Sequence, residues 1–215
     1  MCTEDGSDDA LSFVSDVSYQ SDIADNEPQS INIDLSDGSP LSDTDLTILH
    51  FNVNSILADG RIDRLTDICQ TVKCDVLLLT ESKLSHLIPD NLLLIPGFHE
   101  PVRRDRLVNG RHGGGTMVYV STSHTFIHRP ELQLDNFEHL WVDVKVNNKT
   151  YAVNALYRPP SETADSHTLF LDSAQTLLSK LNTYNCFNRI IMSDLNFGSC
   201  FSILILKKWR QMLVL

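Results

Sequence analysis

The chain has 215 residues, enough for one sizeable domain or for a smaller domain with a tail. Its net charge of -11 is concentrated at one end, because residues 1–45 hold 12 of the 28 acidic side chains and no Lys or Arg. The remainder is nearly neutral, which excludes nucleic-acid binding through overall charge alone. A secretory signal is lacking, and no apolar run approaches the ~20 residues of a membrane helix. We therefore expect an intracellular protein, nuclear or cytoplasmic, that does not use a membrane.

Residues 1–45 form an acidic segment with repeated Ser-Asp pairs and few large apolar residues. Such a segment buries too little surface to offset the entropy of ordering, so we predict that it is disordered. Two interpretations remain open. It is a solubilising tail or leftover upstream sequence, or its serines accept phosphate and it binds a basic protein partner.

The cysteines exclude two kinds of small stabilised fold. There are five of them, an odd number, and none stands in CxxC spacing. This argues against a disulfide framework and against a zinc site. Cys69 falls on the apolar face of a predicted helix and Cys186 follows another, so both are expected to be reduced thiols.

From residue 46 the pattern predicts alternating strands and helices. Residues 46–52 are rich in β-formers and suit a buried strand. Asp59 is a candidate N-cap for a helix whose apolar stripe runs from Ile62 to Val72. Residues 75–81 are the next strand. This order predicts a crossover unit with the helix packed on a sheet.

The second half predicts further strands and one helix. Residues 114–121 are a strand, and residues 139–146 and 150–157 are predicted to form a hairpin about Asn147-Asn148-Lys149, with one buried and one wetter face. Residues 165–183 carry a helical stripe with Asp165 or Ser166 as cap. Residues 187–194 are the last strand. The stripe comprises Phe170, Leu171, Ala174, Leu177, Leu178 and Leu181.

Polar side chains end these strands. Asn52 and Glu81 follow two of them, Tyr157-Arg158 ends a third, and Asp194 with Asn196 ends the last. Working groups in α/β folds gather at strand ends. A carboxylate such as Glu81 is the ligand that Mg²⁺ prefers, and Asp194 is suited to deprotonating water. The set is chemically coherent for phosphodiester hydrolysis, although a polar residue at a strand end is more often a simple cap.

Five segments carry a family resemblance in order and approximate spacing. They are "LTILHFNVNSI", "DVLLLTESKL", "RRDRLVNGRHGGGTMVYV", "VNALYRPP" and "IIMSDLNFG". Together they resemble the endonuclease/exonuclease/phosphatase superfamily, most of all its apurinic-type branch in non-LTR retrotransposons. The resemblance implies an α/β fold, a two-sheet β-sandwich core flanked by helices as in deoxyribonuclease I. It covers a domain at 46–198, between the acidic tail at 1–45 and a divergent extension at 199–215.

The resemblance implies a role for each strand-end residue. Asn52 holds the catalytic Asp and a phosphate oxygen, and Glu81 binds Mg²⁺ or Mn²⁺. Tyr157 contacts the scissile phosphate, Asp194 activates water and Asn196 helps to bind the phosphate. Arg158 and Arg104 are the candidate DNA-binding side chains, although the segment at 103–106 is equally suited to a structural ion-pair network.

This sequence departs from the family in ways that bear on activity. Asn54 stands where DNA-repair relatives often have an acid, Ser193 replaces the usual Gly and Leu195 the usual Phe. The family's terminal Ser-Asp-His element has no counterpart, since none of the eight histidines follows Asp194. We therefore expect a C-terminally truncated DNA endonuclease of retrotransposon type with little or no activity.

Several alternatives remain. The chain is a non-catalytic retroelement remnant that binds a partner through its acidic tail, a relative acting on phosphoinositides, sphingomyelin or poly(A), or an artefact of the gene model. "GRHGGG" lacks the Lys-Ser/Thr of a Walker motif, so its glycines serve a turn or a close backbone approach. His124 and His128 lie in a predicted loop without the Glu of a zinc motif.

Overall fold

The computed structural model describes residues 46–108, 111–135, 138–160, 164–186, 188–197 and 200–207. The acidic segment 1–45 lies outside the described residues, so its predicted disorder stays a prediction. Among the described residues, no helix is long and apolar enough to cross a membrane.

Most strands belong to two sheets. The first has the order β1-β2-β6-β3, with β1 at Ile48–Asn52, β2 at Val76–Thr80, β6 at Thr116–Val120 and β3 at Val102–Arg104. The second has the order β11-β10-β9-β8-β7, with β11 at Cys200–Lys207, β10 at Asn188–Phe197, β9 at Lys149–Tyr157, β8 at His139–Val146 and β7 at Thr125–His128. A separate ribbon pairs β4 (Leu107–Val108) with β5 (Arg111–His112). The helices are α1 (Arg61–Val72) and α2 (Ala164–Thr183), with short 3-10 turns η1 (Asp90–Leu92) and η2 (Pro130–Leu132).

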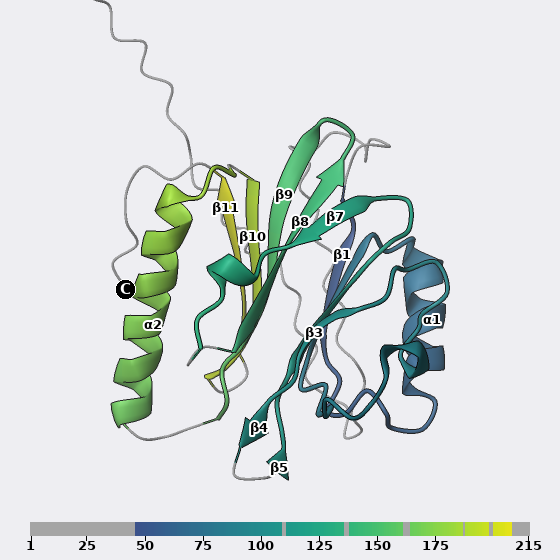
Figure 1. Cartoon of the computed structure of the whole chain (residues 1–215), viewed down its shortest axis with the longest axis horizontal. Coiled ribbons are helices and arrows are strands. Elements are labelled where there is room, and N and C mark those ends of the chain that lie inside the picture. The colour runs from purple at the N-terminus through teal and green to yellow at the C-terminus, as the bar shows by residue number, and fades with distance from the viewer. Residues whose placement is uncertain are drawn as a thin grey trace, which may run out of the picture.

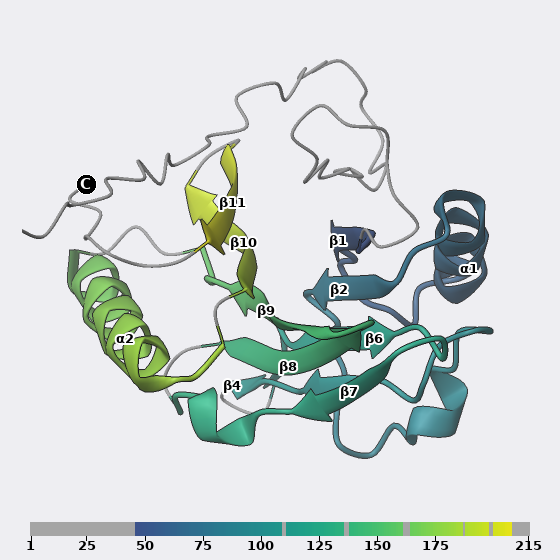
Figure 2. The ribbon, with the colours of Figure 1, turned by 90° about the horizontal axis from the view of Figure 1, so that it is seen from above.

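The two sheets pack face to face, and a helix covers the outer face of each. Figure 1 shows the strands between α2 on the left and α1 on the right, and Figure 2 again places the helices on opposite sides. Three apolar clusters fill the layers: one between the sheets, around Leu78 and Val142; one under α1, around Leu65 and Leu77; and one under α2, around Trp141. This confirms the predicted α/β fold with a two-sheet core flanked by helices.

The predicted crossover unit is present, with β1 and β2 parallel and α1 packed on their sheet. The predicted cap of α1 is wrong. The N-cap is Gly60, in the left-handed region at φ 66°, and no side chain caps the helix. The chain enters the helix through a tight turn that glycine adopts without a Cβ penalty.

The predicted hairpin is present as β8 and β9, but its turn is only Asn147-Asn148, because Lys149 already belongs to β9 and pairs with Val146. The prediction of one wet face is wrong, because α2 and η2 cover that face as well. Trp141 and Asp143 are therefore buried, and only Lys145 remains exposed on β8. The Asp143 charge is compensated by Arg129, whose Nε and Nη2 donate to its Oδ2 at 2.8 and 2.6 Å.

Helix α2 begins at Ala164, one residue earlier than predicted, and not all residues of its predicted apolar stripe are buried. Asp165 and Ser166 lie inside the helix, so neither is its cap. Leu177 and Leu181 are buried as predicted, but Leu171 is 58% exposed. The stripe is thus shorter at the N-terminal end than the pattern indicates.

Some strands were not predicted. The segment of His124 and His128, predicted to be a loop, contains β7, because it pairs with β8 at the sheet edge. Strand β10 continues to Phe197, and Cys200–Lys207 of the divergent extension pairs with it antiparallel as β11. The functional strand end therefore lies within a longer strand than expected.

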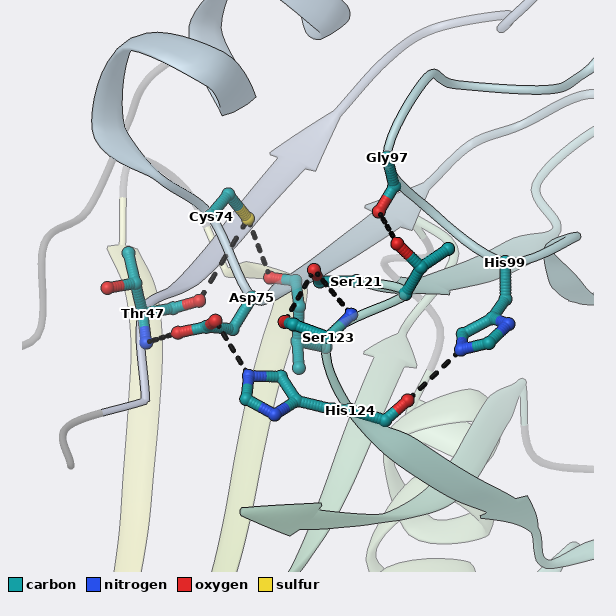
Figure 3. Close-up of polar contacts among 10 residues, drawn as sticks. Thr47, Cys74, Asp75, Gly97, His99, Ser121, Ser123 and His124 are labelled. Atoms are coloured by element: carbon teal, nitrogen blue, oxygen red, sulfur yellow. Dashed lines mark hydrogen bonds and ion pairs between the residues drawn. The ribbon is translucent and has the colours of Figure 1, made fainter. Parts of the chain in front are cut away.

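The strand starts of β1 and β2 are tied to the turn before β7 (Figure 3). The Asp75 carboxylate accepts the Thr47 N–H at 2.7 Å through Oδ2, and its Oδ1 lies 2.8 Å from His124 Nε2. The Ser121 N–H donates to the Asp75 carbonyl at 2.8 Å. These bonds fix one end of the first sheet, opposite the end that carries Asn52 and Glu81.

Candidate active site

Four strands, two from each sheet, bring polar side chains to one edge of the sandwich. Asn52 is the last residue of β1, and Glu81 directly follows β2, which runs parallel to it. Tyr157 is the last residue of β9, and Asp194 is its partner on the parallel strand β10. Because the facing sheets each present a parallel pair here, all four side chains meet.

Hydrogen bonds join the four side chains into one cluster. Asn52 Nδ2 donates to Glu81 Oε1 at 2.8 Å and to Asp194 Oδ2 at 2.7 Å. The Tyr157 hydroxyl donates to Glu81 Oε1 at 3.1 Å. The Asn54 N–H donates to Asn52 Oδ1 at 3.1 Å, which turns the amide nitrogen toward the carboxylates. One amide thus bridges two acids from different sheets, and we call these four residues, Asn52, Glu81, Tyr157 and Asp194, the amide–carboxylate cluster.

Burial shifts the acid–base properties of the cluster. Asp194 is 7% exposed, and burial raises the pKa of its carboxyl, with a further rise from Glu81 and an opposing effect of the Asn52 hydrogen bond. Burial, together with the neighbouring Glu81 charge, also raises the pKa of Tyr157. Tyr157 therefore stays a neutral hydrogen-bond donor, and Asp194 is a stronger base than a solvated aspartate.

Lys83 places a positive charge beside Glu81. Its Nζ lies 3.3 Å from Glu81 Oε2, the oxygen that Asn52 and Tyr157 leave open, and it also donates to Asn54 Oδ1. Among the described residues, no group of three or more His, Cys, Asp or Glu side chains is arranged around a metal position. Glu81 still fits Mg²⁺, which commonly takes one or two carboxylates and completes its shell with water and phosphate. The Lys83 ammonium lies beside the Glu81 oxygen that such a cation would bind.

The variant Lys83→Met is therefore expected to bind Mn²⁺ more tightly than the parent. Removing a partly exposed ammonium competitor is worth up to ~1 kcal/mol, or about two- to fivefold in affinity. The loss of the free-ion signal in Mn²⁺ electron paramagnetic resonance measures this. Lys145→Met, which removes an exposed lysine on β8, is the matched control. Unchanged or weaker binding by Lys83→Met contradicts the competition.

Arg158 and Asn196 support the part of β10 around Asp194 in this structure. Arg158 is 4% exposed, its Nη1 donates to the Leu195 carbonyl at 3.1 Å, and its guanidinium lies 5.4 Å from the centre of the Phe170 ring. The Asn196 amide donates to the Arg158 carbonyl at 2.7 Å. The backbone N–H of Asn196, rather than its side chain, donates to Asp194 Oδ1 at 3.4 Å. The predicted phosphate and DNA contacts of both residues stay predictions.

Arg104 also has a structural environment. Its guanidinium is half-buried and donates to three backbone carbonyls before and within β8, while its neighbour Arg103 forms ion pairs with Asp90 and Asp105, each at 2.8 Å. These contacts favour the structural interpretation of the segment, and DNA binding by Arg104 stays a prediction. The three acceptors are Leu134 (2.8 Å), Asp135 (3.1 Å) and His139 (3.2 Å).

Two residues beside the cluster, Lys83 and Glu138, were not predicted from the sequence. Glu138 precedes β8, its side chain is 9% exposed, and burial raises the pKa of its carboxyl. The glycines of "GRHGGG" were predicted to serve a turn or a close approach, and this is confirmed for Gly114 and Gly115, whereas a Cβ on Gly113 would meet nothing within 4 Å. Gly114 and Gly115 have φ of 74° and 90°, and a Cβ on either would collide with Glu138 or Ser82. Neither an acid before a strand nor a lysine after an acid is distinctive in sequence.

Comparisons with known proteins identify a family and a shared fold. A sequence model described as Endonuclease/Exonuclease/phosphatase family matches residues 49–198. No curated protein matches the sequence significantly.

Similar solved structures share the fold at low sequence identity. The human Nocturnin catalytic domain with bound sulfate is 10% identical at a TM-score of 0.55, covering 81% of this chain and 69% of its own. A 3' phosphatase from Neisseria bound to product DNA hairpin is 17% identical at a TM-score of 0.51, covering 71% of this chain and 58% of its own. The endonuclease domain of TRAS1, a telomere-specific non-LTR retrotransposon, is 16% identical at a TM-score of 0.47, with 71% and 59% covered. The chain thus spans less than two thirds of the latter two proteins.

Proposed function

The chain belongs to the endonuclease/exonuclease/phosphatase family, and we propose that it is a divalent-metal-dependent phosphodiester hydrolase that acts on DNA. The observation that carries this proposal is the bridging amide, since Asn52 Nδ2 donates to both Glu81 and Asp194. The Asn52 amide thus holds the carboxylate proposed to bind a cation, Glu81, next to the carboxylate proposed to accept a proton, Asp194. Phosphodiester hydrolysis needs this division of roles, because the attacked phosphate is anionic.

Asp194 is the general base of the proposed reaction. It takes a proton from the attacking water, and the rise of its pKa through burial strengthens it as a base. Asn52 fixes the orientation of the Asp194 carboxylate without adding negative charge that would repel the phosphate. The hydroxyl of Tyr157, kept neutral by burial, donates its one proton to Glu81 Oε1, and it would have to turn from Glu81 to donate to a phosphate oxygen.

Glu81 is the proposed metal ligand. A bound Mg²⁺ or Mn²⁺ would supply charge neutralisation and Lewis-acid polarisation at the phosphate. The bonds from Asn52 and Tyr157 hold Glu81 Oε1, so that Oε2, which lies 3.3 Å from Lys83 Nζ, would be the oxygen left to bind the cation. Such support fixes a ligand's orientation and adds to metal affinity.

We propose a DNA endonuclease of retrotransposon type, on the basis of "LYRPP" and "GGGTMVYV", which resemble that branch of the family. The Neisseria phosphatase that shares the fold is bound to a DNA hairpin, which agrees with DNA as the substrate class. We expect slow turnover, because Asn54 offers no second carboxylate and the Lys83 ammonium neighbours Glu81.

A substrate panel tests this function. The full chain, in excess over substrate with Mg²⁺, is incubated with supercoiled plasmid, an abasic oligonucleotide, poly(A) and a phosphoinositide. Nicking of plasmid or oligonucleotide, abolished by chelation and retained in the surface control Glu131→Gln, is the expected result. Turnover of poly(A) or phosphoinositide in preference to DNA contradicts the proposed substrate class.

A further inference from the structure

The Glu138 side chain binds the glycine turn that precedes β6. Its Oε1 accepts the N–H of Gly115, and its Oε2 lies 3.4 Å from Arg106 Nε. The turn has no room for a Cβ, because one on Gly114 would meet the Glu138 carboxylate and one on Gly115 would meet Ser82 Oγ. The carboxylate and the turn therefore fit each other with no side chain between them.

The same turn holds the backbone that carries Glu81. The carbonyl of Gly115 accepts the N–H of Ser82 at 3.2 Å, and that of Gly114 accepts the N–H of Lys83 at 2.8 Å. This segment is strained, since Glu81 and Lys83 have φ of 54° and 53°. Left-handed backbone costs ~1 kcal/mol or more per residue outside glycine and persists only where the surroundings impose it.

Glu138 also reaches the other sheet. Its backbone carbonyl accepts the N–H of Tyr157 at 2.8 Å, and the Tyr157 hydroxyl donates to Glu81 Oε1 at 3.1 Å. Glu138 is thus linked to Glu81 in two ways. Its side chain binds the glycine turn that holds the Glu81 backbone segment, and its backbone carbonyl binds Tyr157, whose hydroxyl binds the Glu81 carboxylate. Arg106 balances its charge in a buried environment.

We propose that Glu138 is a positioning residue that holds Glu81 in its metal-binding conformation through the hydrogen bond to Gly115. This rests on the proposed function, in which Glu81 binds the cation. The accepting oxygen matters more than the negative charge, because the glycine turn is bound through a backbone N–H. Loss of a residue that orients a metal ligand typically costs about 10- to 100-fold in metal affinity.

The variants Glu138→Gln and Glu138→Asp separate these contributions. Gln keeps the length and an accepting oxygen but loses the charge, whereas Asp keeps the charge but is one methylene shorter. Mn²⁺ binding to the full chain, followed by electron paramagnetic resonance, is expected to stay within about threefold of the parent for Gln and to weaken about tenfold for Asp. Hydrogen exchange of the Ser82 and Lys83 amides without metal is expected to accelerate in Asp more than in Gln. Glu131→Asp, at an exposed glutamate, is the control.

Binding by Glu138→Asp that equals or exceeds that of Glu138→Gln overturns the proposal, because charge then outweighs the hydrogen bond. Equal binding and equal amide exchange in the parent and both variants overturn it as well, while leaving the proposed function intact. If the parent binds no Mn²⁺, the proposed metal site fails, and this inference fails with it.

Discussion

Replacing Asp194 by Asn is expected to slow DNA nicking by about 10²- to 10⁴-fold while leaving the folded protein at least as stable at neutral pH. Asn cannot accept a proton from water, so the general base is lost. It still offers an oxygen to the amide of Asn52, which donates to Asp194 Oδ2 at 2.7 Å. Burial and the nearby Glu81 charge disfavour the ionised Asp194 carboxyl, and the neutral amide avoids that cost.

The stability difference between Asp194→Asn and the parent has a defined pH dependence. The pKa of the Asp194 carboxyl is raised above its ordinary value of 3.8 in the folded state. Ionisation of Asp194 therefore lowers the free energy of unfolding of the parent as pH rises through the folded pKa. This loss of stability disappears as pH falls below 3.8. Thermal unfolding at pH 7 and at acidic pH measures both points. A variant that nicks at the parent rate, or one that is destabilised most at neutral pH, contradicts this prediction.

Asn52→Asp is expected to remove activity and to destabilise the protein at pH 7 by about 2–4 kcal/mol. The change removes the amide nitrogen that donates to both Glu81 and Asp194. It also puts a third carboxylate between them. Repulsion among the three carboxylates depends on their negative charge, so the destabilisation is expected to be smaller at pH 4 than at pH 7.

The control for Asn52→Asp is the same substitution two residues away. Asn54→Asp also converts an amide to a carboxylate, but it places the charge on an exposed residue beside the Lys83 ammonium. Little loss of stability and tighter Mn²⁺ binding are expected there. Denaturant unfolding of both variants at pH 4 and pH 7 decides the matter. Equal destabilisation of the two at pH 7 means that added charge alone, and not the lost bridge, is responsible.

Much of the site was predictable because strand ends can be recognised from sequence. The parallel pairing of β1 with β2 follows from a strand, helix and strand in succession, and it brings Asn52 and Glu81 to one edge. That Asp194 joins them depends on how the two sheets face each other. No local pattern determines that packing, and the resemblance to a family supplied it.

The wrong prediction on β8, and the contacts that were not predicted, have physical causes. Alternation along β8 predicts one exposed face, but tertiary packing of α2 buries Trp141 and Asp143 on it. Glu138 acts through a backbone N–H of a turn distant in sequence, and Arg158 acts through the carbonyl of Leu195. Contacts of this kind depend on backbone geometry, so residue type and spacing give no signal for them.

Glu81 and Asp194 are proposed to act together in one phosphodiester-hydrolysing site. A double-mutant cycle of Glu81→Gln and Asp194→Asn, in single-turnover nicking of supercoiled plasmid with Mg²⁺, tests this proposal most directly. Residues that act as a unit give strongly non-additive losses. We predict that each variant loses nearly all nicking and that the double variant is no slower than the slower single variant. Losses that multiply, or a Glu81→Gln protein that nicks at the parent rate, would contradict the account.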